Sequence, residues 1–187
     1  MKLLFIGLVL AGAAFAQEDS YLTRGQLELR GLVGAFGASR LSPRPAYGGE
    51  LAYGLKNWVA VTGGYVYNSL VAVNSNACTN GVCSTATGKA GIKETTAGVR
   101  FTTLGRVALY AAASGGMAIL SSKVSGSAGP FSVSDSKASK HMAAAGGGGA
   151  DFSLSRSWGF AADVRVVKAI GLTPYLRLAG GVYFRFQ

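Results

Sequence analysis

Few residues of this chain have the types and spacing that catalysis requires. His141 is the one histidine, and as a general base it would need a nucleophile within reach. Met142 and Ala143 follow it, so no hydroxyl stands two residues on. The glycine run 146–149 lacks the Lys-Ser/Thr that completes a phosphate-binding loop. We therefore expect no enzyme activity, no cofactor and no metal site.

The two cysteines, Cys78 and Cys83, lie in a polar stretch on either side of Asn80-Gly81. A metal site would need further ligands, and His141 is distant in the sequence. In an exported protein, so close a pair most often forms a disulfide. We expect a disulfide that closes a small loop and contributes modest stability.

The N-terminus has the organisation of a secretory signal peptide. Lys2 precedes an apolar run, Leu3 to Leu10, and Ala14-Phe15-Ala16 matches a small-residue cleavage site. We expect residues 1–16 to be removed and residues 17–187 to form one domain.

Beyond this segment no apolar run approaches the roughly 20 residues of a membrane helix. Yet only 14% of residues are charged, 28 are glycine, and the chain as a whole is apolar. This composition leaves a glycine-rich soluble β protein or a membrane β-barrel.

The last stretch, residues 174–187, separates into two faces when read in alternate positions. One face is apolar and ends in Phe184 and Phe186, whereas the other carries Tyr175, Arg177, Tyr183 and Arg185. Side chains alternate across a strand. An apolar face opposite a polar face is typical of a transmembrane β-barrel, in which one face meets lipid and the other a polar interior.

Seven earlier segments alternate in the same way, which gives an even count of eight. The expected strands span about 26–36, 47–55, 58–68, 93–101, 107–117, 141–154, 158–167 and 174–187. Long polar loops are expected at 39–45, 74–91 and 121–140, and tighter connections at 56–57, 103–106, 155–157 and 168–173. Loops that alternate in length indicate an up-and-down outer-membrane barrel with its short turns and both termini at the periplasmic end.

Charged residues within the expected strands fall opposite the large apolar ones, except Lys93, which is near a loop end and could reach the membrane interface. Because a base on the lipid face would cost about 2–4 kcal/mol at mid-membrane, this segregation favours a membrane barrel. We expect the inward charges to pair into a salt-bridged plug, with Arg177 and Arg185 as partners for Glu28, Glu50 or Glu94. A narrow pore lined by the same residues is the alternative. The expected interior charges are Glu28, Arg30, Glu50, Glu94, Arg100, Asp151, Asp163, Arg165, Arg177 and Arg185. Aromatic residues near strand ends, where an aromatic girdle would lie, are Tyr47, Trp58, Tyr67, Phe101, Trp158 and Phe186.

The formal net charge of +10 raises the question of an anionic partner. No set of interleaved basic and aromatic residues indicates nucleic-acid binding, so none is expected. Basic outer loops could meet lipopolysaccharide phosphates or an anionic host or matrix surface, or could be an ordinary solvated surface. The basic residues expected in or beside these loops are Arg40, Arg44, Lys89, Lys93, Lys123, Lys137 and Lys140.

The segments GGELAYGLKNWVAVTGGYVY (Gly48 to Tyr67) and LRLAGGVYFRF (Leu176 to Phe186) resemble the small eight-stranded outer-membrane barrels of the OmpA/OmpX type. The resemblance covers the mature chain and implies a barrel in the outer membrane of a Gram-negative bacterium. It also implies that the assembly machinery reads Val182, Phe184 and Phe186, although Gln187 follows the last aromatic residue.

Some barrels of this size modify lipid A, and the deacylase type pairs a histidine with a serine two residues on; here that position is Ala143. We therefore expect a monomer with a structural or surface-interaction role. A narrow small-solute channel is the alternative, and a lipid-modifying enzyme that uses His141 is the third hypothesis. A soluble exported β-barrel or sandwich is the competing fold.

Overall fold

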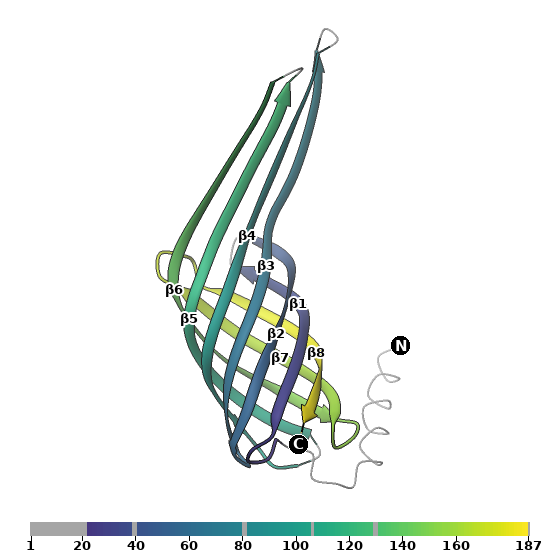
Figure 1. Ribbon diagram of the computed structural model, residues 1–187, viewed down its shortest axis with the longest axis vertical. Coiled ribbons are helices and arrows are strands. Elements are labelled where there is room, and N and C mark those ends of the chain that lie inside the picture. The colour runs from purple at the N-terminus through teal and green to yellow at the C-terminus, as the bar shows by residue number, and fades with distance from the viewer. Residues whose placement is uncertain (1–21, 39–40, 80–81, 106, 129–130, 187) are drawn as a thin grey trace.

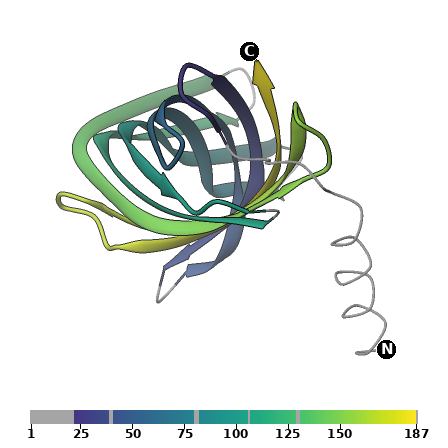
Figure 2. The ribbon, with the colours of Figure 1, turned by 90° about the horizontal axis from the view of Figure 1, so that it is seen from below.

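The computed structural model describes residues 22–38, 41–79, 82–105, 107–128 and 131–186. Eight antiparallel strands close into a barrel in sequence order (Figure 1), and the view turned by 90° shows the closed ring (Figure 2). The strands are β1 (Leu27–Ala38), β2 (Leu41–Lys56), β3 (Val59–Thr79), β4 (Val82–Thr102), β5 (Val107–Ala128), β6 (Phe131–Ser153), β7 (Trp158–Ala169) and β8 (Tyr175–Phe186). The predicted fold class is confirmed. The expected signal peptide lies outside the described residues.

The first and last strands close the ring. β1 pairs with β8 from Leu27↔Phe186 to Gly37↔Leu176, so both strands find a partner on each side. Closure removes the unpaired strand edges that hydrocarbon does not tolerate. It also brings the start of β1 and the end of β8 to one end of the barrel, which we call the inner end. The connections after β2, β4 and β6 lie there and span two or four residues.

The three predicted long loops are wrong, because most of their residues continue the strands. β3 and β4 pair as far as Thr79↔Val82, and β5 and β6 as far as Ala128↔Phe131. Within 39–45, β2 begins at Leu41. Pro45 has no backbone N–H to donate to a neighbouring strand. It is tolerated because β2 pairs with β3 only from Ala46↔Asn68 onward, so the edge of β2 that would face β3 makes no ladder hydrogen bond at Pro45.

At the outer end, four strands continue past the barrel rim as a sheet (Figure 1). β2 leaves β3 at Ala46↔Asn68, and β7 leaves β6 at Ala143↔Ala169. Beyond these points β4 still pairs with β5 as far as Ser84↔Ala128. We call this part of β3, β4, β5 and β6 the extension. Its backbone is paired within the sheet, so it protrudes as an ordered blade rather than as loops.

The alanine- and glycine-rich stretch 143–150 forms a continuous part of β6 despite its low strand propensity. Its small residues make room for interior rings. Gly149 is the register partner of Tyr110, and a Cβ at Gly149 would lie 2.7 Å from the Tyr110 ring carbon that bears the hydroxyl. Gly159 stands in the same relation to Tyr183 on β8. Tyr110 and Tyr183 thus each occupy the space that a side chain at a glycine of the neighbouring strand would need.

The barrel interior is layered. At the outer end, Phe36, Val66, Ile92, Val167 and Tyr175 belong to a buried apolar cluster, and Phe36 packs edge-on against Tyr175. A smaller cluster of Leu22, Ala52 and Ala60 lies toward the inner end. Charged side chains occupy the layer between them. In the described part of the chain, no helix has the length and apolar character needed to cross a membrane.

Candidate functional site

All ten charged residues expected inside the barrel are buried, and none is more than 6% exposed. They come from every strand except β3 and β5, and comprise five carboxylates and five guanidinium groups. Their positions follow from the two-residue period of each strand, which turns them inward wherever the large apolar side chains face outward. The interior is therefore formally neutral.

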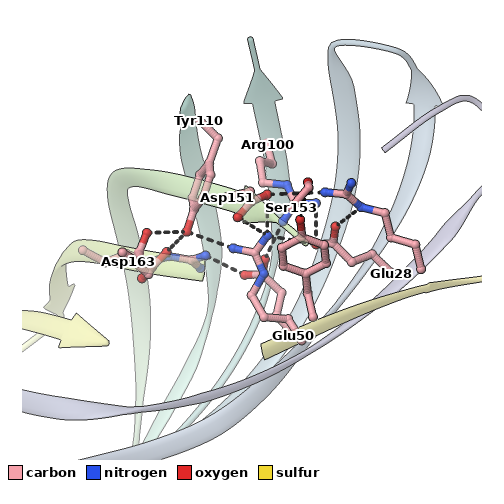
Figure 3. A network of polar contacts seen from close by, with 12 residues as sticks. Glu28, Glu50, Arg100, Tyr110, Asp151, Ser153 and Asp163 are labelled. Carbon is pink, nitrogen blue, oxygen red and sulfur yellow. Dashed lines mark hydrogen bonds and ion pairs between the residues drawn. The ribbon is translucent and has the colours of Figure 1, made fainter. Parts of the chain in front are cut away.

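Glu28 has three ionic partners in this network, part of which is drawn in Figure 3. Its Oε1 accepts hydrogen bonds from Nη2 of Arg30 at 2.9 Å and from Nη2 of Arg100 at 2.8 Å. Its Oε2 accepts one from Nε of Arg185 at 2.8 Å. One carboxylate thus links strands β1, β4 and β8, and charge-assisted bonds of this length are among the stronger ones in proteins.

Two further acids extend the network from Arg30. Nη2 of Arg30 lies 2.9 Å from both carboxylate oxygens of Asp151 on β6. Nη1 of Arg30 donates to the Tyr110 hydroxyl at 2.9 Å, and that hydroxyl donates to Oδ2 of Asp163 at 2.8 Å (Figure 3). Tyr110 therefore relays a contact between β1 and β7, two strands that do not pair with each other in the sheet.

Arg165 joins the remaining acids of the middle layer. It donates through Nε to Asp163 at 3.0 Å and through Nη2 to Glu50 at 2.6 Å. Nη1 of Arg100 lies 3.6 Å from Glu50. Because Arg100 also binds Glu28, Glu50 is connected to Glu28 through this arginine. The charged residues of this layer and Tyr110 therefore form one connected set of contacts.

A second, smaller group lies next to the outer apolar cluster. Glu94 accepts a hydrogen bond from Nη1 of Arg177 at 2.9 Å and further bonds from the Asn68 amide and the Tyr175 hydroxyl. Glu94 thereby has one ionic and two neutral partners.

Four uncharged interior residues of these networks are Asn68, Tyr110, Tyr175 and Tyr183. Tyr175 and Tyr183 stand on the predicted polar face of the last strand, but no role in an interior network was predicted for any of the four. Cations lie over two of the rings, with the Arg30 guanidinium carbon 5.0 Å from the centre of Tyr110 and that of Arg185 4.4 Å from the centre of Tyr183. The Tyr183 hydroxyl also bonds to Ser153 at 2.5 Å. The alternation of each strand places all four at inward positions, and this pattern could have identified them. Tyrosine alone is not decisive, because tyrosines also occur at the lipid interface.

His141 has a serine partner that sequence reasoning missed. Its Nε2 lies 2.9 Å from the hydroxyl of Ser139, and its Nδ1 lies 2.8 Å from the carbonyl oxygen of Ile170. A carbonyl only accepts, so Nδ1 donates and Nε2 accepts. The pair was missed because 121–140 was read as a loop, whereas on a strand residues 139 and 141 share a face.

At the tip of the β3–β4 pair, Cys78 and Cys83 are register partners and form a disulfide. No group of three or more metal-ligating side chains occurs among the residues that the structure describes. Lys89, Lys93, Lys123, Lys137 and Lys140 lie on the strands of the extension and its base, and all are exposed. Arg44 lies on β2 and is also exposed, and Arg40 lies outside the described residues.

Aromatic side chains face outward near both barrel ends. Tyr47 and Tyr67 pack together at the outer end, with ring centres 5.3 Å apart. Trp58 and Phe101 stack at the inner end at 6.1 Å. Between these levels most of the described outward residues are apolar, including Leu29, Leu51, Val61, Val99 and Leu178. An apolar band between two aromatic girdles is the outer surface of a transmembrane barrel.

No family model and no curated protein matches the chain. Solved structures do. Ail of Yersinia pestis, in a complex with the heparin analogue sucrose octasulfate, aligns with a TM-score of 0.61 and 16% identity, over 88% of this chain and 100% of that chain. A major outer membrane protein of Thermus thermophilus aligns with a TM-score of 0.57 and 12% identity, over 86% and 98%. The outer membrane protein OprG of Pseudomonas aeruginosa gives 0.51 and 11%, over 91% and 100%.

This chain has the fold of the small outer-membrane β-barrels. The resemblance inferred from its two segments is thereby confirmed at the level of fold. The predicted outer-membrane location agrees with these neighbours and with the apolar band. Phe184 and Phe186, expected to belong to an assembly signal, lie exposed on the outward face of β8, and Val182 precedes them on the same face.

Proposed function

We propose that the chain is a monomeric, non-conducting outer-membrane barrel with a structural and surface-interaction role, and that its extension meets anionic surfaces outside the cell. The observation that carries this proposal is the filled interior. Five acids and five arginines occupy the middle of the barrel, and apolar clusters lie on either side of them. An eight-stranded barrel is just wide enough for side chains to fill.

A narrow channel is the less favoured function. Passage of a solute through the middle layer would have to separate Glu28 from Arg30, Arg100 or Arg185, all of which are buried. Breaking one buried ion pair costs about 3–5 kcal/mol when a charge is left without its partner. A path that separates several such pairs is closed at ordinary temperatures. The interior network therefore acts as a plug that holds the strands in register.

The surface role rests on where the remaining charge lies. The ten interior charges cancel, so the formal net charge of +10 belongs to the rest of the sequence. In the described part of the chain, Asp135 is the single acid outside the interior. A basic surface attracts phosphate or sulfate groups. Ail, whose fold is similar, has been crystallised with a sulfated sugar, which supports an anionic partner here.

Binding to immobilised heparin, with the protein in vesicles of zwitterionic lipid, tests this role. We expect retention that falls steeply with added salt, because exposed charges are screened within about 10 Å at 0.1 M. Equal passage of the protein vesicles and empty vesicles at low salt would contradict it.

Catalysis is not part of the proposed function. His141 contacts Ser139 and a backbone carbonyl, but no described acid hydrogen-bonds to it. The pair at the barrel mouth fastens the β7–β8 connection through Ile170. Mass spectrometry of lipid A from cells that express the chain or its His141→Ala variant tests this assignment. A lipid A change that only the unaltered chain produces would establish the enzyme instead.

Export and assembly complete the proposal. Residues 1–16 act as the cleaved signal peptide, and Val182, Phe184 and Phe186 form the outward-facing end of the strand that the assembly machinery recognises. Heat-modifiable gel migration of the membrane fraction tests the barrel in cells. A protein that remains soluble without detergent would contradict it.

A further inference from the structure

Two lysines face each other across the extension. Lys89 on β4 and Lys123 on β5 are direct register partners, and both side chains are exposed. Directly opposed residues of an antiparallel pair have Cβ atoms about 4.5–5.5 Å apart, where like charges destabilise the sheet. Asp135 does not relieve this pair, because its register partner is Val124, on the opposite face of the sheet. The arrangement therefore calls for an anion from outside the chain.

These lysines point away from the barrel axis. On β4, positions 95, 97, 99 and 101 are exposed, whereas positions 92, 94 and 100 are buried in the interior. Lys89 and Lys93 share the exposed set. Register partners share a face, so Lys123 also points outward, and so does Lys140 through its partner Ile119, next to Lys93. The four lysines thus occupy two rows on one outward face. Lys93 and Lys140 form the row at the barrel rim, and Lys89 and Lys123 form the row nearer the tip of the extension.

A hollow of about 320 Å³ lies at the row of Lys89 and Lys123, and its polar lining includes Tyr67, Lys89, Ser121, Lys123, Ser136 and Lys137. The floor is shaped by Gly91, because the Tyr67 ring lies where a side chain at that position would stand. The Ser121 hydroxyl donates to the Gly91 carbonyl oxygen at 3.3 Å. The ammonium groups of Lys89 and Lys123, beside the hydroxyls of Tyr67 and Ser136, form a donor set suited to a phosphate group.

The distance of the hollow from the apolar band indicates that the phosphate belongs to a lipid headgroup. Tyr65, Met117 and Met142 are exposed at the upper limit of the apolar band, and Lys93 is the register partner of Tyr67 in the outer girdle. Lys89 is four residues beyond Lys93, roughly 13 Å along a tilted strand. The hollow therefore opens sideways at the level of lipid headgroups rather than upward into the medium.

Above the lysines, the same face carries rows of short hydroxyl side chains. Thr87, Ser125 and Ser134 are consecutive register partners across β4, β5 and β6. Thr85, Ser127 and Ser132 form the next row, and the hydroxyls of Thr85 and Ser127 lie 2.7 Å apart. A second hollow of about 230 Å³ is lined by these two rows. Hydroxyl rows above a cationic row match sugars linked to phosphates.

We infer that this outward face binds the phosphorylated sugar headgroup of a glycolipid in the same membrane leaflet, with the phosphate held between Lys89 and Lys123. The inference rests on the proposed anionic-surface role and specifies its partner, which lies beside the barrel and not opposite its tip. Lys93 and Lys140 contact the same headgroup or a neighbouring one at the girdle.

The test uses the full mature protein in zwitterionic lipid nanodiscs doped with bisphosphorylated lipid A or with its dephosphorylated form. The variant Lys89→Ser/Lys123→Ser is compared with Arg44→Ser/Lys56→Ser, which has the same net charge but keeps every base that lines the hollow. Native mass spectrometry counts bound lipid A, and heat-modifiable migration shows that each variant folds. We expect the first variant to bind bisphosphorylated lipid A about tenfold or more weakly and the second to bind it as the unaltered protein does.

Two results would overturn the inference. Equal losses in both variants would show that overall charge, not this face, determines binding, and would leave the anionic-surface role standing. Undiminished lipid A binding by the first variant, with loss of heparin retention, would assign the face to a soluble polyanion. If the unaltered protein bound neither heparin nor lipid A, the proposed surface role itself would fail.

Discussion

Glu28 on β1 and Arg185 on β8 are register partners across the seam where the barrel closes, and Oε2 of Glu28 lies 2.8 Å from Nε of Arg185. The same carboxylate binds Arg30 and Arg100 through its other oxygen. The pairing of the first and last strands is thus supported from inside the barrel by the residue with the most ionic contacts in the described network.

Glu28→Gln should destabilise the barrel more than any single change at an exposed acid. The substitution keeps the side-chain shape but leaves three buried guanidinium groups with less negative charge to compensate them. We expect a loss of about 3–5 kcal/mol in the free energy of unfolding, the usual consequence of removing one partner of a buried pair. Urea titration in detergent or vesicles, followed by tryptophan fluorescence, measures it. Asp135→Asn is the control, and an equal loss there would contradict the central role of Glu28.

Gly159→Ala tests the packing of Tyr183 over the neighbouring strand. A Cβ at this position would lie 2.3 Å from the Phe152 carbonyl oxygen and 2.5 Å from the Tyr183 hydroxyl oxygen. Forced overpacking typically costs about 1–3 kcal/mol. Gly63→Ala is the matched control, since no heavy atom would lie within 4 Å of its Cβ. Similar urea midpoints for the two variants would show that the ring does not need the glycine.

Phe186→Ala separates assembly in the cell from stability of the fold. Phe186 is 51% exposed on the outward face, so its removal leaves the interior network intact. We expect less folded protein in the membrane fraction of cells, but refolding into detergent close to that of the unaltered chain. Leu178→Ala, another outward residue of β8 that is 51% exposed, controls for lost apolar surface. An equal decrease in both variants would argue against a terminal signal.

The double variant Cys78→Ser/Cys83→Ser should affect the tip of the extension alone. The bond closes a short loop with a sequence separation of 5, so it contributes little chain entropy to the whole fold. We expect faster proteolysis at the β3–β4 tip and an unchanged urea midpoint for the barrel. A shifted midpoint would mean that the extension and barrel unfold together.

The membrane part of the fold was predictable because two different environments act on alternate residues. Leu29 and Leu51 face lipid, whereas Arg30 and Glu50 face the interior, and the period of two is therefore visible in the sequence. In the extension neither face meets the hydrocarbon of the membrane. Ser134 and Asp135, on opposite faces, are both exposed, so hydrophobic alternation is lost although strand pairing continues. For that reason 74–91 and 121–140 were read as loops.

The identity of the charged residues inside the barrel was likewise accessible from the sequence, but their partners were not. Arg185 contacts Glu28 and Arg177 contacts Glu94, which are two of several combinations that alternation allows. The choice depends on the register and stagger of strands far apart in the sequence. Tyr110 contacts Asp163, 53 residues away, only because β5 and β7 are brought together around β6.

The measurement that tests the non-conducting, plugged interior most directly is the electrical conductance of planar bilayers that contain the purified, refolded protein. The connected ion pairs from Glu28 to Arg165 fill the middle of the barrel. We predict no discrete conductance steps for the unaltered chain, even when heat-modifiable migration shows it to be fully folded. Reproducible steps of one size, altered in size by Arg165→Ala, would contradict the plug and establish a pore through the network.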